Sequence, residues 1–308
     1  MASDGAVARG VNPNSIGSDT ERGPWTVRDK VCAVTGASGG IGKEVASGLA
    51  KRGARVVIVS HSKERAAATV DEIVHATLNP HVDLVVADLS TQAGVRSACA
   101  ELDRRYGQLH VLINNAGLLI GKRGLTADSL EKTFALNHLA YFLLTNLLLE
   151  KLLRSAPARI ISTSSMAHAW ANWDWENLQG EKRYSQWRAY SNSKLANLLF
   201  TFELARRLEG RAVTANAVHP GFVRSGFGST ATGPMRLGIR LGWVGAISAL
   251  KGARTTLWAA TAPELSEVSG KYFARCSAVE PSAAAKDEAA QRRLWELSER
   301  LTGVGSAQ

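Results

Sequence analysis

The sequence predicts an α/β fold, in which one doubly wound parallel sheet of about seven strands carries helices on both faces. Short apolar runs alternate with longer helical patterns along most of the 308 residues. Such alternation is typical of a parallel sheet covered by helices, and right-handed crossovers then place helices on both faces. The first apolar run also leads into a glycine-rich turn, TGASGGIG at 35–42. Together these features predict a single Rossmann-type sheet.

The first half of the chain contains four predicted strands. VCAVTG at 31–36 is a short apolar run that ends in glycine, which is typical of a buried strand. Three similar runs follow, with the sequences ARVVIVS, VDLVVADLS and HVLINNAG, at 54–60, 82–90 and 110–117. Helical patterns separate the four runs, at about 41–52, 62–78 and 91–106.

The second half continues the alternation and then interrupts it. A long helical pattern, a strand, a second long helical pattern and another strand follow in order, at about 127–154, 159–165, 185–208 and 213–221. Residues 226–250 contain many glycines and few acids, which indicates an insertion above the sheet. A helix, a short strand and a last helix are predicted near 251–262, 271–274 and 286–302.

Composition favours a single domain in a reducing cellular compartment. Residues 1–24 are polar and rich in Gly, Ser and Asn, which predicts a flexible tail before one domain at 25–308. The three cysteines lie far apart and form no CxxC or Cys/His cluster, so neither disulfides nor a bound metal is expected. We see no signal peptide and no apolar stretch of spanning length, and therefore expect a cytoplasmic protein.

The net charge of +10 suggests attraction to anions, among them nucleotide phosphates. The chain has no basic block and no nucleic-acid-binding motif, so nucleic acid is not an expected partner.

The glycine-rich turn has the features of a phosphate-binding loop. Gly36, Gly40 and Gly42 follow the first predicted strand and open the first predicted helix. Backbone without side chains can approach a pyrophosphate closely, and a helix N-terminus offers it unpaired N–H groups. An ordinary tight turn would also accommodate glycines, but the strand–turn–helix context is the one that dinucleotide binding requires.

A second motif, YSNSK at 190–194, contains a tyrosine and a lysine four residues apart. On a helix such residues lie on one face, so Tyr190 and Lys194 can meet. A nearby ammonium favours the phenolate, which predicts a lowered pKa for Tyr190 and an acid and base usable near neutral pH. A surface pair on an amphipathic helix is the simpler interpretation of this motif taken alone.

With TGASGGIG, NNAG at 114–117 and YSNSK, the sequence resembles the classical short-chain dehydrogenase/reductase family over about residues 28–302. Segments 137–154, 178–182, 190–207 and 218–221 are similar to its retinol dehydrogenase-like branch. That branch reduces or oxidises lipophilic aldehydes, ketones and alcohols, including retinoids and steroids. The resemblance therefore implies an oxidoreductase with a lipophilic small-molecule substrate.

The resemblance also implies four catalytic residues. Tyr190 matches the general acid/base, and Lys194 matches the lysine that lowers its pKa and binds the nicotinamide ribose. Ser165 matches the serine that holds the substrate oxygen, with Ser164 as the alternative register. Asn137 matches the helix asparagine that holds a water in the proton relay, although a helix-interior amide bonded to backbone is the other interpretation.

The cofactor is expected to be NADP(H), with NAD(H) as the alternative. The position after the second strand, where NAD-preferring enzymes carry an acid, is Ser60. His61, Lys63 and Arg65 follow it, and solvated surface cations are the common alternative for such residues. The predicted cofactor-binding residues are Gly36, Ser38, Gly40, Ile41, Gly42, Ser60, His61, Lys63, Arg65, Asp88, Leu89, Asn115, Ala116, Gly117, Tyr190, Lys194, Pro220, Gly221, Val223 and Ser225.

The substrate side of the predicted site is apolar. Residues 234–250 carry Arg236 and Arg240 and no acids. A substrate lid, an oligomer contact and contact with a membrane surface all fit this segment. Four tryptophans precede Tyr190 and form either an aromatic wall or ordinary loop packing; they are Trp170, Trp173, Trp175 and Trp187.

Other residues near the predicted site have less direct roles. His168 and His219 are expected to be structural or to line the pocket.

The family's long helices often pair subunits, which implies a homo-dimer or homo-tetramer.

The function predicted from these residues is hydride transfer between NADP(H) and a carbonyl or alcohol, in the domain 25–308 with a lid at about 226–250. Two alternatives stay open: reduction of a C=C bond on the same framework, and a nucleotide-binding scaffold without turnover.

Overall fold

The computed structural model describes residues 25–224, 228, 230–242 and 245–305. The predicted flexible tail, 1–24, and the predicted cofactor contact Ser225 lie outside the described residues. The side chains of Ile239 and Arg240 are also outside this description.

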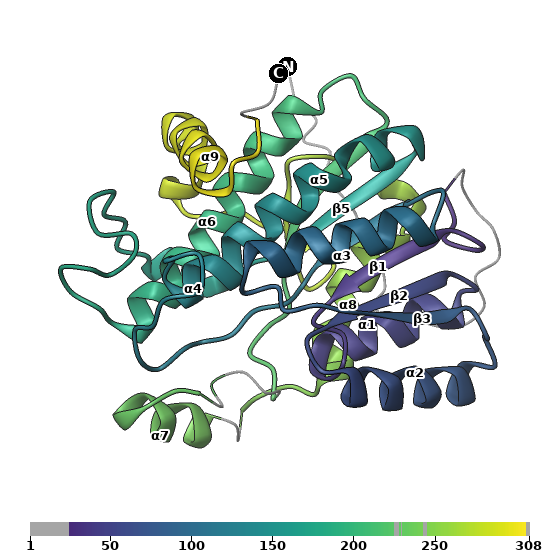
Figure 1. The fold of residues 1–308 in the computed structure, drawn as a ribbon, viewed down its shortest axis with the longest axis horizontal. Helices are drawn as coiled ribbons and strands as arrows, with labels where there is room; N and C mark the ends of the chain where they lie inside the picture. The colour runs from purple at the N-terminus through teal and green to yellow at the C-terminus, as the bar shows by residue number, and fades with distance from the viewer. Residues whose placement is uncertain (1–24, 225–227, 229, 243–244, 306–308) are drawn as a thin grey trace, which may run out of the picture.

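The described chain forms one sheet, which confirms the predicted fold class (Figure 1). The strands are β1 Val31–Thr35, β2 Arg55–Ser60, β3 Val82–Val86, β4 Val111–Asn114, β5 Ala158–Thr163, β6 Val213–His219, β7 Tyr272–Ala274 and β8 Ser277–Ala278. Their order is β3-β2-β1-β4-β5-β6-β7-β8, and all pairs are parallel except β7–β8. The two-residue β8 was not predicted, because so short a strand has no period in sequence.

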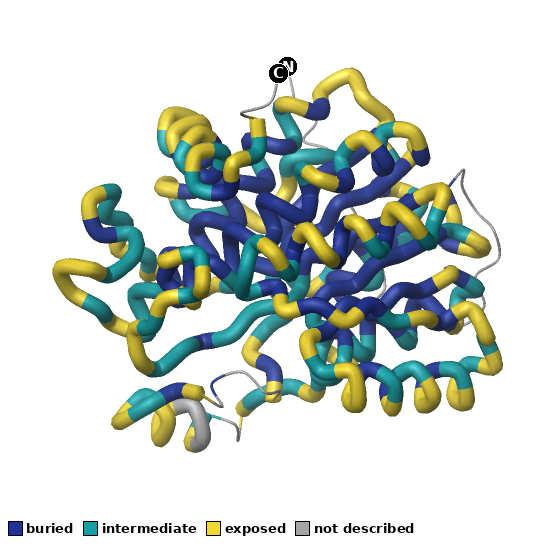
Figure 2. The backbone as a smooth tube through the Cα atoms, viewed as in Figure 1, coloured by how far each residue is buried: buried dark blue, intermediate teal, exposed yellow. Residues whose placement is uncertain are grey.

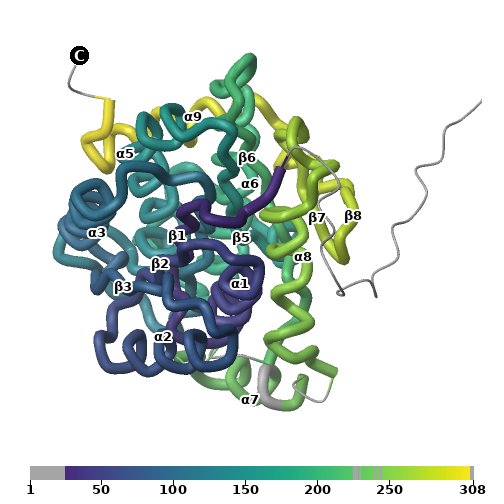
Figure 3. The backbone as a smooth tube through the Cα atoms, turned by 90° about the vertical axis from the view of Figure 1, so that its right-hand side faces the viewer, coloured from purple at the N-terminus to yellow at the C-terminus, as the bar shows by residue number. Residues whose placement is uncertain are grey.

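Helices cover both faces of the sheet. The helices are α1 Gly40–Lys51, α2 Lys63–Thr77, α3 Gln92–Arg105, α4 Lys132–Phe134, α5 Ala140–Arg154, α6 Gln186–Arg207, α7 Gly233–Gly242, α8 Ala249–Thr261 and α9 Glu288–Thr302. Helix α8 packs beside α1 on one face, and α3 packs beside α5 on the other, as Figure 3 shows. None of the helices in the described parts of the chain is both long and apolar enough to cross a membrane.

Strand side chains alternate between two hydrophobic clusters. Ala33 and Val57 belong to the cluster under α3 and α5, whereas Val34 and Ile58 belong to the cluster under α1 and α8. Successive side chains of a strand point to opposite faces, so a strand that is apolar throughout is buried on both sides. Figure 2 shows the buried strands between helices whose outer sides are exposed.

The long helix predicted at 127–154 begins later than expected. Glu131 is buried, and its carboxylate accepts hydrogen bonds from the N–H groups of Thr133 (2.9 Å) and Phe134 (2.8 Å). This N-cap starts α4 at Lys132, after Leu125 and Glu131 have paired in an isolated bridge. A π-helical turn, Ala135–Leu139, then separates α4 from α5. Such turns are frequent at functional sites.

The predicted insertion at 226–250 contains α7, which lies apart from the helices that cover the sheet (Figure 1). The chain returns to the body where Val223 pairs with Ile247 in an isolated parallel bridge. Ser248 then caps α8, because its hydroxyl accepts a hydrogen bond from the N–H of Lys251 at 3.3 Å.

Candidate active site

One cavity of about 1890 Å³ runs along the carboxyl ends of the strands. This edge is where ligands bind in open α/β sheets. Its lining includes the glycine-rich loop after β1, the loops after β2 to β6, the start of α8 and the β7–β8 turn. Most of the predicted cofactor residues therefore border one continuous space.

The glycine-rich loop and the loop after β4 are held together tightly. Thr35 Oγ1 accepts hydrogen bonds from the N–H groups of Asn115 (2.8 Å) and Ala116 (3.0 Å). Gly36 has a φ of 65°, and a Cβ there would lie 2.8 Å from Ala116 Cα. A Cβ on Gly42 would lie 2.6 Å from Asn115 Nδ2. Only glycine fits these positions, so the groove keeps bare backbone where a dinucleotide phosphate would bind.

The side chains after β2 suit a phosphorylated ribose. Ser60 Oγ donates a hydrogen bond to Ser38 Oγ at 2.9 Å, and no acid occupies this position. The Arg65 guanidinium lies over the glycine loop. A Cβ built on Gly39 would be 3.3 Å from Arg65 Nη2. His61 lines the same part of the cavity, whereas Lys63 does not line it.

The loop after β3 lies where the adenine is expected. Asp88 and Leu89 line the cavity, and Asp88 Oδ1 accepts a hydrogen bond from the N–H of Ser90 at 2.9 Å. Lys43, just past the glycine loop, is paired with Glu72 at 2.5 Å. The dinucleotide groove thus contains the predicted adenosine contacts and one nearby arginine.

Tyr190, Ser165 and Lys194 meet at the middle of the cavity. Tyr190 is only 8% exposed, and its phenol is hydrogen-bonded to the side chain of Ser165. Lys194 Nζ donates a hydrogen bond to the carbonyl of Thr163 at 3.1 Å and lies 5.6 Å from the centre of the Tyr190 ring. Ser164 Oγ instead donates to the backbone carbonyl of Lys194 at 2.7 Å. The structure therefore turns Ser165, and not Ser164, toward the phenol.

Burial controls the ionisation of this site. Burial raises the pKa of Tyr190 to about 12, and the hydrogen bond with Ser165 lowers it only in part. Burial also lowers the pKa of Lys194 to about 7. The expectation that Lys194 lowers the pKa of Tyr190 is therefore wrong for this structure, because removing both groups from water favours their neutral forms.

Asn137 lies in the π-helical turn and has its amide group fully bonded within the protein. Its Oδ1 accepts a hydrogen bond from the N–H of Leu118 (2.9 Å), and its Nδ2 donates to the carbonyl of Leu118 (2.9 Å) and to Ser193 Oγ (3.0 Å). Asn137 is fully buried and is not part of the cavity lining. It connects the loop after β4 to α6, which carries Tyr190.

Two histidines support the loop that carries Ser165. His168 Nε2 accepts a hydrogen bond from the N–H of Ser282 at 3.0 Å, so its Nδ1 carries the proton and donates to the carbonyl of Ser165 at 2.6 Å. His219 Nδ1 accepts from the N–H of Met166 at 3.3 Å. Burial lowers the pKa of both rings, that of His219 to about 4. Both line the cavity as neutral structural groups, as expected.

The loop after β6 lines the part of the cavity where the nicotinamide is expected. Pro220, Gly221 and Val223 all border the cavity, and Gly221 has a φ of 90°. Val223 is buried and packs closely on Gly252 of α8. A Cβ on Gly252 would lie only 2.5 Å from Val223 Cγ2.

The predicted lid segment covers Tyr190. The N–H of Gly121 donates a hydrogen bond to the carbonyl of Thr230 at 3.1 Å, and Thr230 Oγ1 donates to the carbonyl of Leu119 at 2.6 Å. Gln186 and Thr232 exchange two hydrogen bonds, of 3.0 and 3.1 Å. Leu119, Ala167 and Ala231 form a small buried cluster with Tyr190.

Only two of the four tryptophans border the cavity. Trp170 and Trp187 line it, with ring centres 6.4 Å apart. Trp173 and Trp175 pack edge to face at 5.2 Å, outside the lining, and Arg293 covers Trp175 at 4.4 Å. The aromatic wall therefore contains two of the four tryptophans that the sequence suggested.

Sequence reasoning missed the far wall of the cavity. Additional lining residues come from the start of α8 and from the β7–β8 turn: Lys251, Arg254, Thr255, Arg275 and Cys276. They belong to no motif and follow Tyr190 by at least 61 residues, so only the folded chain brings them to the site.

Comparisons with known proteins agree with this geometry. A sequence model of the family "short chain dehydrogenase" matches residues 30–233. Human retinol dehydrogenase 12 is 44% identical over 275 residues, which cover 89% of this chain and 87% of the relative. Human retinol dehydrogenase 13 is 40% identical over 291 residues, which cover 91% and 86%.

Two solved structures share the fold. An uncharacterised protein from Mycobacterium paratuberculosis superposes with a TM-score of 0.72 at 33% identity, over 91% of this chain and 95% of that one. A short chain dehydrogenase from Burkholderia cenocepacia in complex with NADP superposes with a TM-score of 0.64 at 27% identity, over 80% and 96%. The chain therefore belongs to the NAD(P)-dependent short-chain dehydrogenase/reductase family, in its retinol dehydrogenase-like branch.

Proposed function

We propose that this protein interconverts a carbonyl and an alcohol on a lipophilic small molecule with NADP(H), using Tyr190 as the general acid/base. One observation carries the proposal: the buried Tyr190 phenol, hydrogen-bonded to Ser165, opens onto the cavity that the glycine-rich loop also lines. Family membership supports the reaction type, and the positions of these side chains support the proposed roles.

A bound nicotinamide dinucleotide would supply or accept the hydride. In the reductive direction Tyr190 gives its proton to the substrate oxygen while Ser165 donates a hydrogen bond to the same oxygen. Because burial holds the pKa of Tyr190 at about 12, the phenol is protonated at neutral pH and ready to donate. Lys194 lies beside the ring and beside Gly117, where it can bind the ribose hydroxyls.

NADP(H) is favoured over NAD(H) by the charges after β2. Arg65 lies over the glycine loop and His61 borders the cavity, so a 2′-phosphate would meet a cation there. An acid at the position of Ser60 would bind the ribose hydroxyls of NAD(H) and repel a 2′-phosphate. Ser60 does neither. A solved relative also binds NADP.

A lipophilic substrate is favoured by the apolar groups around Tyr190. Trp170, Trp187 and Phe222 line the cavity, and Leu119 and Ala231 are buried against the phenol. The relatives are named retinol dehydrogenases, which makes retinoid-like alcohols and aldehydes suitable first compounds for assays.

The test is NADPH oxidation across a panel of lipophilic aldehydes, ketones and quinones. Tyr190→Phe should lower kcat by about 10²-fold or more, because it removes the proton donor. Tyr106→Phe is the matched control. The Tyr106 phenol donates a hydrogen bond to Asp83 at 2.8 Å, and Tyr106 does not line the cavity. A Tyr190→Phe protein as active as the natural one would contradict the proposed role.

Two other functions have distinct outcomes in the same assay. Products reduced at a C=C bond would indicate the double-bond reductase. Cofactor binding without turnover across the panel would indicate the nucleotide-binding scaffold.

Cytoplasmic location and assembly into dimers or tetramers stay predictions, which fractionation and sedimentation velocity can test. Contact of residues 234–250 with a membrane surface is a further prediction. It is supported by α7, whose Leu237 and Leu241 are 61% and 66% exposed beside Arg236. Flotation with anionic vesicles tests it.

A further inference from the structure

The cavity has a cationic wall, formed by Lys251, Arg254 and Arg275. Lys251 and Arg254 are three residues apart on α8 and therefore share a helix face. Arg275 stands at the turn between β7 and β8. All three residues line the cavity that Tyr190 opens onto.

The turn that carries Arg275 has an unfavourable backbone. Arg275 and Cys276 have φ values of 53° and 57°, and they join the paired residues Ala274 and Ser277. A two-residue hairpin turn with positive φ at both positions normally contains Asn and Gly. Here an arginine and a cysteine hold this conformation, and both border the cavity. Strained positions of this kind cluster at ligand-binding sites.

Few acids line the cavity beside these cations. Among the described residues that line the cavity, the acids are Asp88, at the adenine side, and Glu280. Glu280 is paired with Lys286 at 2.9 Å. The pKa of His219 is lowered to about 4, first by burial and then by nearby positive charge, to which Arg275 contributes.

The sheet order places Arg275 far from the glycine-rich loop. In the order β1-β4-β5-β6-β7, the β7–β8 turn lies four strands from the glycine-rich loop after β1. Neighbouring strands are about 4.8 Å apart, so this separation is roughly 19 Å. Dinucleotide phosphates bind at the loop after β1. Arg275 therefore lies away from the phosphate-binding loop, at the end of a strand two places along the sheet from β5, which leads to Ser165.

We propose that the substrate is an amphipathic acid: a lipophilic carbonyl or alcohol compound whose anionic oxygen group, such as a carboxylate, binds the cationic wall. Its apolar body lies against Trp170 and Trp187, and its reacting carbon faces Tyr190 and Ser165. A guanidinium can hold a carboxylate through two parallel hydrogen bonds, which explains an arginine at the turn. This inference rests on the proposed function.

The test compares one long-chain aldehyde that ends in a carboxylate with the methyl ester of the same compound. We expect the natural protein to show a KM about tenfold lower for the acid than for the ester. In Arg275→Asn this preference should fall to about threefold or less, because the charge is gone while asparagine tolerates a positive φ. Arg254→Gln should weaken the preference as well, and Arg275→Lys should retain most of it.

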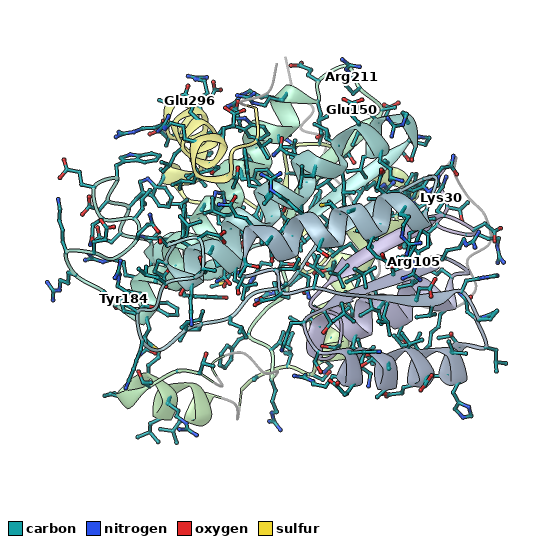
Figure 4. The ribbon with its side chains drawn as sticks, viewed as in Figure 1. Lys30, Arg105, Glu150, Tyr184, Arg211 and Glu296 are labelled. Atoms are coloured by element: carbon teal, nitrogen blue, oxygen red, sulfur yellow. The ribbon has the colours of Figure 1, made fainter. Side chains whose placement is uncertain are left out.

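The control is Arg211→Asn, an exposed arginine before β6, at the edge of the molecule opposite α7 (Figure 4). It should leave both KM values unchanged. The KM for NADPH should also be unchanged in Arg275→Asn. Equal KM values for acid and ester in the natural protein would overturn the inference, and so would a cofactor KM that rises with Arg275→Asn.

A failure of the proposed function can be told apart from a failure of this inference. If neither compound is turned over, calorimetric titration of the acid and the ester into the NADP⁺-bound protein still measures the preference. Tighter binding of the acid that depends on Arg275 supports the cationic wall. Equal binding overturns it, whatever the turnover.

Discussion

At the scale of single residues, Ser164 and Ser165 show how neighbouring identical side chains acquire different roles. Ser165 follows β5, caps the 3₁₀ turn Met166–Trp170 and faces Tyr190. Ser164 is buried and donates to the carbonyl of Lys194 at 2.7 Å. One hydroxyl bonds the Tyr190 phenol, where we propose that it also binds the substrate oxygen, and the other holds the backbone of α6.

We therefore expect different effects from two alanine substitutions. Ser165→Ala should lower kcat by about 10²-fold, since it removes a donor to the reacting oxygen, and should cost about 1 kcal/mol of stability through the lost cap. Ser164→Ala should lower the free energy of unfolding by about 1 kcal/mol, with a much smaller effect on kcat, since it removes a structural hydrogen bond. Steady-state kinetics and urea unfolding measure the pair. A larger kcat loss for Ser164→Ala would exchange the two roles.

At the scale of elements, the predicted lid segment is held by a close approach between two loops. A Cβ on Gly121 would lie 2.4 Å from the carbonyl oxygen of Thr230, which is a backbone atom of the lid segment. That contact is too short for any side chain. The hydrogen bonds of Thr230 and Thr232 around Gly121 close the segment over Tyr190.

Gly121→Ala should push the lid segment away from Leu119 and raise the KM for the lipophilic substrate. The Kd for NADPH should change little, because the glycine-rich loop is not involved. Gly107→Ala is the matched control, since a Cβ there meets nothing within 4 Å. A Gly121→Ala protein with the KM of the natural one would show that the lid does not form part of the substrate site.

The β7–β8 turn allows a second prediction at this scale. Replacing Arg275 and Cys276 with Asn and Gly should raise the free energy of unfolding by about 1–2 kcal/mol, because these residues suit a positive φ at both positions. Differential scanning calorimetry should show a higher melting temperature. A lower melting temperature would mean that the side chains of Arg275 and Cys276 stabilise the turn by more than the backbone costs.

At the scale of the whole molecule, burial of a charged group makes stability depend on pH. The pKa of Lys194 falls from 10.5 to about 7 on folding, because burial disfavours the ammonium. Above pH 7 the folded state has lost a proton that the unfolded chain still holds. Raising the pH therefore favours folding over this range.

We expect the free energy of unfolding to rise by ~1 kcal/mol per pH unit between about pH 7 and pH 9. Lys194→Met should flatten this slope, because the group that titrates is gone. Urea unfolding at several pH values measures both proteins. Parallel profiles for the two would show that Lys194 keeps its proton in the folded state.

The sequence by itself determined the architecture and the local chemistry of the site. Alternating apolar runs specify strands and helices through short-range periods, and the glycine-rich loop and the Tyr190–Lys194 spacing depend on residues within one turn or one helix. Contacts of this range are readable along the chain. The same holds for Ser60, whose position at the end of β2 follows directly from the apolar run before it.

The tertiary structure decided what depends on packing between distant segments. It turned Ser165 toward Tyr190, buried the amide of Asn137 in a π-helical turn, raised the pKa of Tyr190, and brought Arg275 to the cavity. The physical reason is that burial and the close approach of distant side chains are properties of the assembled surfaces. Neither is encoded in the spacing of neighbouring residues.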